Sequence, residues 1–137
     1  MKTAYTILIV DDDLRNLKLL EAMLIPLEYQ VVKASSGEEA LSVVEKIDLD
    51  LILLDIMMPV MDGFTLAQKM REKHIDIPFM FLTSRSMKID VLKGFSLGAV
   101  DYVKKPIDEE ELVVRLNSLL ARLSPPGNQQ GQKSKIV

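Results

Sequence analysis

The residues best suited to chemistry in this 137-residue sequence are polar side chains that directly follow short apolar runs. They are Asp11, Asp12 and Asp13 after TILIV, Asp55 after LILL, Thr83 and Ser84 after FMFL, and Lys104 and Lys105 after VDYV. Carboxylates held close together repel one another, so a bound cation is their natural compensation. Hard oxygen ligands in small number suit Mg²⁺, which takes one or two carboxylates together with phosphate oxygens. These residues therefore favour magnesium and phosphate chemistry, provided that the fold brings them together.

Composition excludes several other kinds of site. The sequence has no cysteine and a single histidine, His74. Disulfides and thiolate zinc sites are therefore excluded. Serine–histidine triads and multi-histidine metal centres are disfavoured because the sequence has only one histidine. Any chemistry must use carboxylates, hydroxyls and lysine.

The charge and the N-terminus limit the partners. The formal net charge is −3, and nucleic-acid binding depends largely on Lys and Arg that neutralise phosphates. We therefore expect no direct nucleic-acid binding by this segment. The apolar run in MKTAYTILIVDDD is too short for a signal peptide and has no small-residue cleavage site. We expect a cytoplasmic protein without membrane association.

Apolar runs alternate with segments of helical periodicity along the chain. Such uninterrupted runs are typical of strands buried on both faces of a parallel sheet. Strands are expected at 6–10, 30–34, 51–54, 79–82 and 100–103, and helices near 14–27, from Ser36, from Gly63, over 87–97 and from Asp108. The first helix is expected to bury a stripe of Leu14, Leu17, Leu20, Leu24 and Leu27. Ser36 with Glu39, and Asp108 with Glu111, have the spacing of capping boxes.

Five β-α units in succession predict a doubly wound α/β fold. Helices must cover both faces of the parallel sheet, which gives a three-layer sandwich. Ligands bind in such folds beyond the carboxyl ends of the strands, where the polar residues above are expected. The expected domain covers residues 1–123. Residues 124–137, SPPGNQQGQKSKIV, are expected to form a flexible linker or tail.

Four motifs resemble those of a two-component response-regulator receiver domain. ILIVDDD, LILLDIMMPVMDG, FLTS and DYVKKP stand in the family's order and approximate spacing, and the resemblance extends over residues 5–123. It implies a five-stranded flavodoxin-like (βα)5 fold with strand order 2-1-3-4-5. It also implies a phosphoacceptor switch rather than an enzyme, which takes its phosphoryl group from a sensor histidine kinase or phosphotransfer protein in a Mg²⁺-dependent reaction.

The resemblance also implies how the carboxylates divide their work. Asp55 resembles the family's phosphoacceptor. Asp11 and Asp12 resemble the acidic pair that holds Mg²⁺ together with Asp55, Asp12 directly and Asp11 through water. Met57 is expected to offer its backbone carbonyl to the metal, so its side-chain type does not disqualify it. Met57 and Arg85, which correspond to positions that overhang the site in this family, predict slow self-dephosphorylation.

Further positions correspond to the family's phosphate contacts and switch. Thr83 resembles the hydroxyl that bonds a phosphoryl oxygen, and Lys105 resembles the ammonium that pairs with it. Pro106 suggests a cis Lys105–Pro106 peptide, because proline removes most of the cost of the cis form. Tyr102 resembles the aromatic residue that enters the space left when Thr83 moves toward the phosphoryl group.

The helical segments look most like receivers joined to winged-helix DNA-binding domains. Such receivers often dimerise through the face made by the fourth helix, fifth strand and fifth helix. Asp101, Glu111 and Arg115 resemble parts of the salt-bridge set used there. The set is incomplete, because Val91 and Val100 stand where that subfamily usually has charged residues. A transcriptional output domain and a homodimer are therefore expectations of the resemblance alone.

Other classes stay open on the residues. A Mg²⁺-dependent phosphohydrolase of the haloacid-dehalogenase type also uses an aspartyl nucleophile, but it normally has a second aspartate where this sequence has Met57. A flavin or nucleotide module of similar fold would need a Gly- or Ser/Thr-rich anion loop after the first strand instead of three acids. A stand-alone receiver that acts by protein–protein interaction is the remaining alternative.

Overall fold

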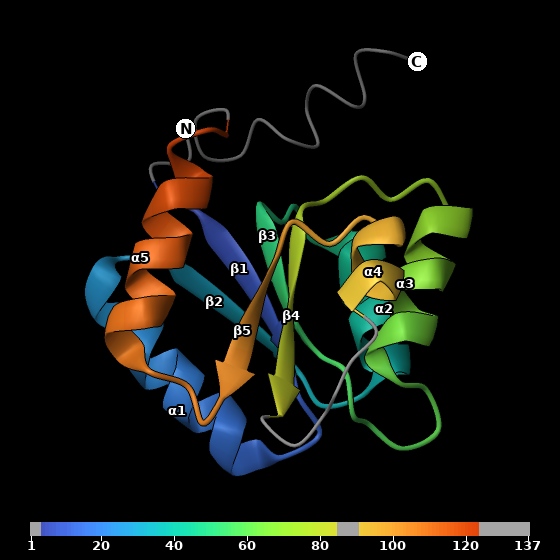
Figure 1. Ribbon diagram of the computed structural model, residues 1–137, viewed down its shortest axis with the longest axis horizontal. Helices are drawn as coiled ribbons and strands as arrows, with labels where there is room; N and C mark the ends of the chain where they lie inside the picture. Colours follow the sequence, from blue (N-terminus) through green and yellow to red (C-terminus); the bar gives the residue numbers. More distant parts are fainter. Residues whose placement is uncertain (1–3, 85–90, 124–137) are drawn as a thin grey trace.

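The computed structural model describes residues 4–84 and 91–123, which form a parallel sheet between two layers of helices. The strands are β1 Thr6–Val10, β2 Gln30–Ala34, β3 Leu51–Asp55, β4 Phe79–Ser84 and β5 Asp101–Lys105. The helices are α1 Leu14–Leu24, α2 Gly37–Lys46, α3 Gly63–Glu72, α4 Val91–Ser96 and α5 Glu109–Leu120, with a 3₁₀ turn η1 at Ile25–Leu27. The strand order is β2-β1-β3-β4-β5 (Figure 1), as predicted.

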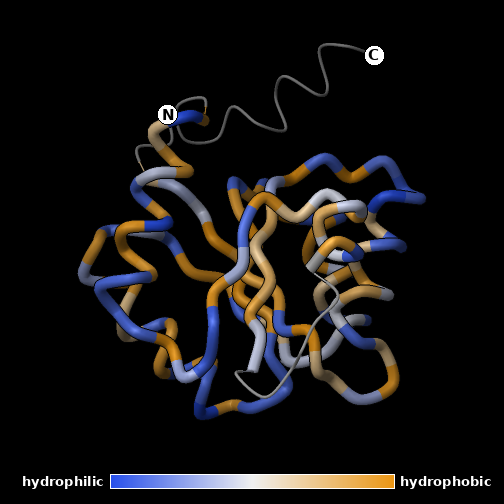
Figure 2. The backbone as a smooth tube through the Cα atoms, viewed as in Figure 1, coloured by the Kyte–Doolittle hydropathy of each residue, from blue (hydrophilic) through white to orange (hydrophobic). Residues whose placement is uncertain are grey.

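Each face of the sheet is covered by its own helices. In Figure 1, α1 and α5 lie on one side of the strands, and α2, α3 and α4 lie on the other. Alternate residues of the strands face the two sides, so each side has its own apolar cluster. Strands β1 and β3 are buried along their whole length, and the central strands are largely orange in the hydropathy colouring of Figure 2. The apolar runs predicted from the sequence therefore form the middle of a three-layer sandwich.

Side chains at the predicted positions cap the helices. The Ser36 hydroxyl accepts a hydrogen bond from the Glu39 amide at 3.1 Å, and the Glu39 carboxylate accepts one from the Ser35 amide at 2.6 Å. Asp108 caps α5 by accepting from the Glu111 amide at 3.0 Å. These caps satisfy amide groups that have no partner within the helix, and they fix where each helix leaves its strand.

The first helix is shorter than its leucine pattern predicts. Leu17, Leu20 and Leu24 are buried, but Leu14 is 63% exposed and Leu27 is 39% exposed. Including these two in the buried stripe was therefore wrong. Leu14 is the first residue of α1, at the outer end of the helix, and Pro26 lies in η1, where the chain leaves the α-helix.

The element boundaries differ from the prediction in the second half of the chain. Strand β5 begins at Asp101 rather than at Val100, which is 41% exposed, and it runs on to Lys105. Strand β4 likewise continues through Thr83 and Ser84. Of the fourth helix predicted over 87–97, Val91–Ser96 is helical, whereas residues 87–90 lie outside the described residues. Gly98, two residues past the end of α4, has a φ of +103°, a left-handed conformation that favours glycine after a helix.

Within the described ranges, 4–84 and 91–123, no helix is long and apolar enough to cross a membrane. The longest, α5, has 12 residues, whereas a spanning helix needs about 20 mostly apolar residues. The described helices are instead the amphipathic covers of one sheet.

We expect Ser36→Ala to lower the free energy of unfolding by about 1 kcal/mol, because the Glu39 amide loses its acceptor at the start of α2. Urea unfolding measures this change. Ser42→Ala, in the middle of the same helix, is the matched control. Alanine is the better helix former there, so stability should stay equal or rise slightly. Equal losses in the two variants would contradict the capping role.

Candidate functional site

The parallel register brings the ends of β1, β3, β4 and β5 to one edge of the sheet. Val10 of β1 pairs with Leu54 of β3. Asp11 follows Val10 and Asp55 follows Leu54, so the two aspartates are neighbours. Ser84 of β4 pairs with Lys105 of β5. All strands are parallel, and the arrowheads of β4 and β5 point to this edge in Figure 1. The polar residues predicted to follow the strands therefore lie together.

Three carboxylates form the centre of the site. Ligand oxygens of Asp11, Asp12 and Asp55 lie within 4.8 Å of one another. Asp11 is fully buried and Asp55 is 3% exposed, whereas Asp12 is exposed to solvent. Buried carboxylates are costly unless they are paired or bound to a cation. The arrangement therefore calls for positive charge.

Lys105 supplies one positive charge from the end of β5. Its Nζ lies 2.7 Å from Asp11 Oδ2 and 3.0 Å from Asp55 Oδ1. Burial alone would lower the pKa of Lys105, but the hydrogen bonds to Asp11 and Asp55 outweigh that effect and raise it. The ammonium is thus firmly charged and bridges two carboxylates that come from different strands. The peptide bond between Lys105 and Pro106 is cis.

One lysine does not offset all of the negative charge. Burial and the neighbouring Asp11 raise the pKa of Asp55 to about 6, although Lys105 acts in the opposite direction. Asp55 is therefore poised near neutrality, and an additional cation would favour its charged form. A carboxylate that titrates near neutrality beside other acids is common at functional sites.

The third acid of the DDD motif has a separate task. Asp13 is the N-cap of α1, and its carboxylate accepts a hydrogen bond from the Arg15 amide at 2.9 Å. The hydrogen bond from Arg15 lowers the pKa of Asp13. Asp11 Oδ1 accepts from the Asp13 amide at 2.9 Å, which fixes the buried carboxylate. The motif therefore divides between the acidic cluster and a helix cap.

Three further predicted residues lie on β4, on β5 and in the loop after β3. Thr83 is buried at the end of β4, and its hydroxyl donates to the Ser84 carbonyl oxygen at 3.3 Å. Tyr102 pairs with Phe81 across β4 and β5, and the two ring centroids are 5.6 Å apart. Met57, in the loop after β3, is 62% exposed. The predicted contribution of Arg85 lies outside the described residues.

Gly63 is a structural requirement of the site that the residue-by-residue prediction missed. A Cβ there would overlap the Asp55 carbonyl oxygen and lie 2.8 Å from Ile56 Cα. The Gly63 amide also donates to the Ile56 carbonyl oxygen at 2.8 Å. The loop that follows Asp55 therefore folds back against its own strand, and only glycine allows this approach. The MDG sequence before α3 was the available signal.

The salt-bridge residues predicted on the fifth strand and helix lie together within one chain. Arg115 Nη1 contacts the Asp101 oxygens at 2.9 and 2.8 Å, and Arg115 Nε contacts Glu111 Oε1 at 3.1 Å. These groups are partly exposed, so their contribution to stability is small.

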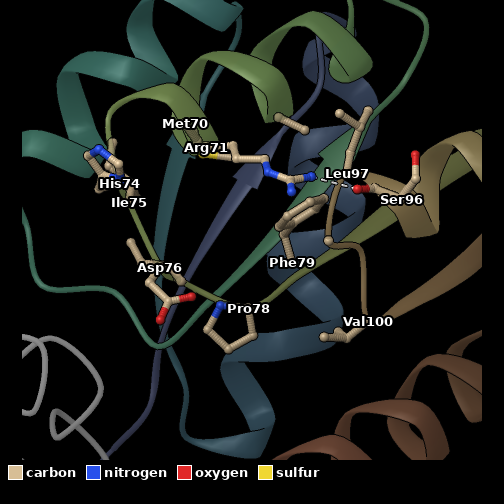
Figure 3. Close-up of a pocket in the computed structure, with 13 residues that line it drawn as sticks. Met70, Arg71, His74, Ile75, Asp76, Pro78, Phe79, Ser96, Leu97 and Val100 are labelled. Atoms are coloured by element: carbon tan, nitrogen blue, oxygen red, sulfur yellow. Dashed lines mark hydrogen bonds between the residues drawn. The ribbon is translucent and has the colours of Figure 1, made fainter.

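A cleft of about 720 Å³ lies at the opposite edge of the sheet, and Asp11, Asp12 and Asp55 are not among the residues that line it. It lies between the ends of α3 and α4 (Figure 3), with Phe79 and Pro78 in its wall. The Arg71 side chain crosses the cleft, and its Nη1 donates to the Ser96 carbonyl oxygen at 2.7 Å. The cleft is thus separate from the carboxylates, and its polar contact joins α3 to α4.

Known proteins of similar sequence are response regulators. Residues 7–117 match the response regulator receiver domain family. The response regulator SaeR of Staphylococcus epidermidis is 41% identical over 118 residues, which cover 86% of this chain and 51% of that protein. SaeR of Staphylococcus aureus is 39% identical over 117 residues, 85% of this chain and 51% of that protein. The chain thus spans about half the length of these curated relatives.

Solved structures give the same result. A response-regulator structure from Chloroflexus aurantiacus has a TM-score of 0.78 and 38% identity, covering 87% of this chain and 99% of that one. The receiver domain of a Pseudomonas aeruginosa sensor histidine kinase has a TM-score of 0.75 and 31% identity, covering 84% and 96%. That structure has a magnesium ion coordinated in its active-site cleft.

The chain belongs to the response regulator receiver domain family. It is a receiver of two-component signalling, a phosphoacceptor switch rather than a catalytic enzyme. The family decides against the phosphohydrolase and flavin-module alternatives. In this chain, Asp11, Asp12 and Asp55 form the acidic pocket of the receiver.

We expect Asp55→Asn to stabilise the metal-free chain at pH 7.5. The pKa of Asp55 is raised from 3.8 to about 6, so the folded state binds the proton more tightly than the unfolded state. Stability is therefore lost as pH rises from about 4 to about 6, and the full penalty is present above this window. Because one pKa unit corresponds to about 1.4 kcal/mol, we expect a gain of roughly 1–3 kcal/mol at pH 7.5 and little gain at pH 4.

Urea unfolding with a chelator at both pH values measures this effect. Asp76→Asn, an exposed acid outside the cluster, is the control and should change stability by less than about 0.5 kcal/mol. A loss of stability in Asp55→Asn at pH 7.5 would contradict the unfavourable charge assigned to Asp55.

Proposed function

We propose that Asp55 accepts a phosphoryl group from the phosphohistidine of a sensor histidine kinase or phosphotransfer protein. One observation carries the proposal: Asp55 ends the buried central strand β3, 3.0 Å from the Lys105 ammonium and beside two further carboxylates. A carboxylate is a weak nucleophile in water, but a rigid strand can hold it in line with the phosphorus atom. The apolar run of β3 is the rigid support.

The proposed step exchanges one bond to phosphorus for another. An Asp55 carboxylate oxygen attacks the phosphorus, the bond from phosphorus to the histidine nitrogen breaks, and the imidazole leaves with the electron pair. Negative charge spreads over three phosphoryl oxygens during the transfer. Lys105 would pair with one of these oxygens, and the Thr83 hydroxyl would donate to another after leaving the Ser84 carbonyl.

The donor set suits Mg²⁺. Asp11, Asp12 and Asp55 offer hard oxygens within 4.8 Å of one another, and burial together with the charge of Asp11 raises the pKa of Asp55. We propose that these three carboxylates and the Met57 backbone carbonyl hold the ion, Asp11 through a water molecule. When bound, the ion would neutralise charge on the carboxylates and on the phosphoryl oxygens. Lys105, which pairs with Asp11 and Asp55 in the structure, would then be released toward the phosphoryl group.

We propose that phosphorylation shifts a conformational equilibrium on the face made by α4, β5 and α5. Movement of Thr83 toward the phosphoryl group would vacate space on the α4 side of the sheet, where Phe81 and Tyr102 lie. Tyr102 would enter that space and carry the change to α4. The phosphoryl group acts as a ligand that favours one of two existing arrangements.

The output is proposed from relatives that are about twice as long. A winged-helix DNA-binding domain beyond this chain, acting in the cytoplasm, would make the receiver a regulator of transcription, as the relatives named SaeR are response regulators with a second half. A homodimer through α4, β5 and α5 is also proposed. Arg115 contacts Asp101 and Glu111 of its own chain, so such a dimer would have to exchange these ion pairs for contacts between subunits.

Intact-mass spectrometry after incubation with acetyl phosphate tests the proposed acceptor. We expect one added phosphoryl group that requires Mg²⁺, is removed by hydroxylamine and is absent in Asp55→Asn. Asp13→Asn is the matched control. Asp13 belongs to the same acidic motif after β1 but caps α1, so this variant should keep the adduct.

Persistence of the Mg²⁺-dependent adduct in Asp55→Asn would show that another residue is the acceptor.

The lifetime of the adduct tests the role of Met57, whose side chain is 62% exposed next to the site. We expect slow hydrolysis, because Met57 is neither a carboxylate nor an amide that could orient water. Loss of the adduct within seconds would contradict that expectation.

A further inference from the structure

The Tyr102 hydroxyl occupies the space that a side chain at Gly94 would need. A Cβ at Gly94 would overlap Tyr102 Oη and lie 2.7 Å from Tyr102 Cζ and 3.2 Å from Phe81 Cδ2. Real Cβ atoms essentially never approach another atom as closely as these two contacts with Tyr102. The tyrosine can take its described position only because the facing helical residue has no side chain.

Glycine is an unusual choice at this place in a helix. Gly94 lies inside α4, Val91–Ser96, and glycine is among the least favourable residues in a helix interior because it loses the most backbone freedom. Its φ does not lie in the left-handed range, so alanine could adopt the backbone conformation. Helical geometry therefore does not require glycine here, whereas the Tyr102 hydroxyl does.

The C-terminal part of α4 is held in place, so the helix cannot easily retreat from the tyrosine. The Gly94 carbonyl accepts hydrogen bonds from the amides of Leu97 and Ala99, both at 3.1 Å. Arg71 of α3 donates to the Ser96 carbonyl at 2.7 Å (Figure 3). A side chain at position 94 would therefore displace the end of the Tyr102 side chain rather than the helix backbone.

Aromatic contacts hold the ring on both sides of this recess. The Tyr102 ring centroid is 5.6 Å from that of Phe81 and 5.2 Å from that of Phe95, which follows Gly94 in α4. Phe81 and Thr83 are two residues apart on β4 and so face the same side of the sheet. The recess thus lies along the same face as the hydroxyl that is proposed to move.

We propose that Gly94 is a positioning residue of the switch: it forms the recess that holds the Tyr102 hydroxyl in the unphosphorylated chain. This inference rests on the proposed switching role of Tyr102 and adds the partner against which the tyrosine is held. In the proposed switch Tyr102 has two positions, the recess at Gly94 and the space that Thr83 leaves. A side chain at position 94 removes the first of these. The receiver then starts from a displaced tyrosine, whether or not Asp55 is phosphorylated.

Fluorine NMR of protein labelled with 3-fluorotyrosine tests the recess directly. The chain has three tyrosines, Tyr5, Tyr29 and Tyr102, and Tyr102→Phe identifies the resonance of interest. In unphosphorylated Gly94→Ala we expect the Tyr102 resonance to leave its wild-type position, while the other two stay. Leu92→Ala, an 81% exposed position on the same helix, is the control and should leave all three unchanged. An unmoved Tyr102 resonance in Gly94→Ala would overturn the proposal.

The same spectra separate this inference from the proposed function. In the wild-type chain, acetyl phosphate and Mg²⁺ should move the Tyr102 resonance. If that resonance stays while Gly94→Ala displaces it, the switching role of Tyr102 is wrong and the recess is correct. If phosphorylation moves it but Gly94→Ala does not, the recess is wrong and the switching role stands.

Thermal unfolding supplies a test that is independent of the label. Gly94→Ala should lower Tm in the wild-type chain, because the methyl group meets Tyr102. In a Tyr102→Ala background it should lower Tm much less, or raise it, because that overlap is gone and alanine has the better helix propensity. Should Gly94→Ala alone fail to fold, adding Tyr102→Ala should restore folding. Equal changes of Tm in the two backgrounds, or no restoration, would overturn the proposal.

Discussion

The structure depends on the enforced closeness of like charges at the ends of two adjacent parallel strands. Asp11 follows β1 and Asp55 ends β3, and the register of these fully buried strands leaves the carboxylates no room to separate. Lys105 bridges them from β5 at 2.7 and 3.0 Å. The apolar sheet therefore stabilises the fold and at the same time maintains an electrostatic imbalance that a cation and a phosphoryl group can relieve.

That imbalance links the chemistry to the proposed switch. Lys105 is shared between Asp11 and Asp55, so any new charge at the site changes which partner the ammonium prefers. Thr83 lies at the end of the adjacent strand, and on the same face Phe81 separates it from the recess at Gly94 that holds Tyr102. A change at the carboxylates can therefore reach α4 through neighbouring side chains of β4 and β5 without large movements of the sheet.

Much of this arrangement could be predicted from the sequence, because buried parallel strands have a strong local signature. The five strands, their order and the meeting of Asp11, Asp12 and Asp55 followed from apolar runs and the receiver motifs. The exposure of Leu14 and the recess at Gly94 could not be predicted, since both depend on which parts of other elements lie opposite. Similarly, nothing in the spacing alone indicates that Lys105 contacts Asp11 as closely as Asp55.

The most direct test of the enforced closeness is a carbon-13 NMR titration of the Asp55 side-chain carboxyl in the metal-free chain. Asp55→Asn assigns the resonance. Burial and the charge of Asp11 should place the pKa of Asp55 at about 6, and Mg²⁺ should lower it. A pKa near the ordinary aspartate value of about 4, unchanged by Mg²⁺, would show that the carboxylates are not forced together and would contradict this account.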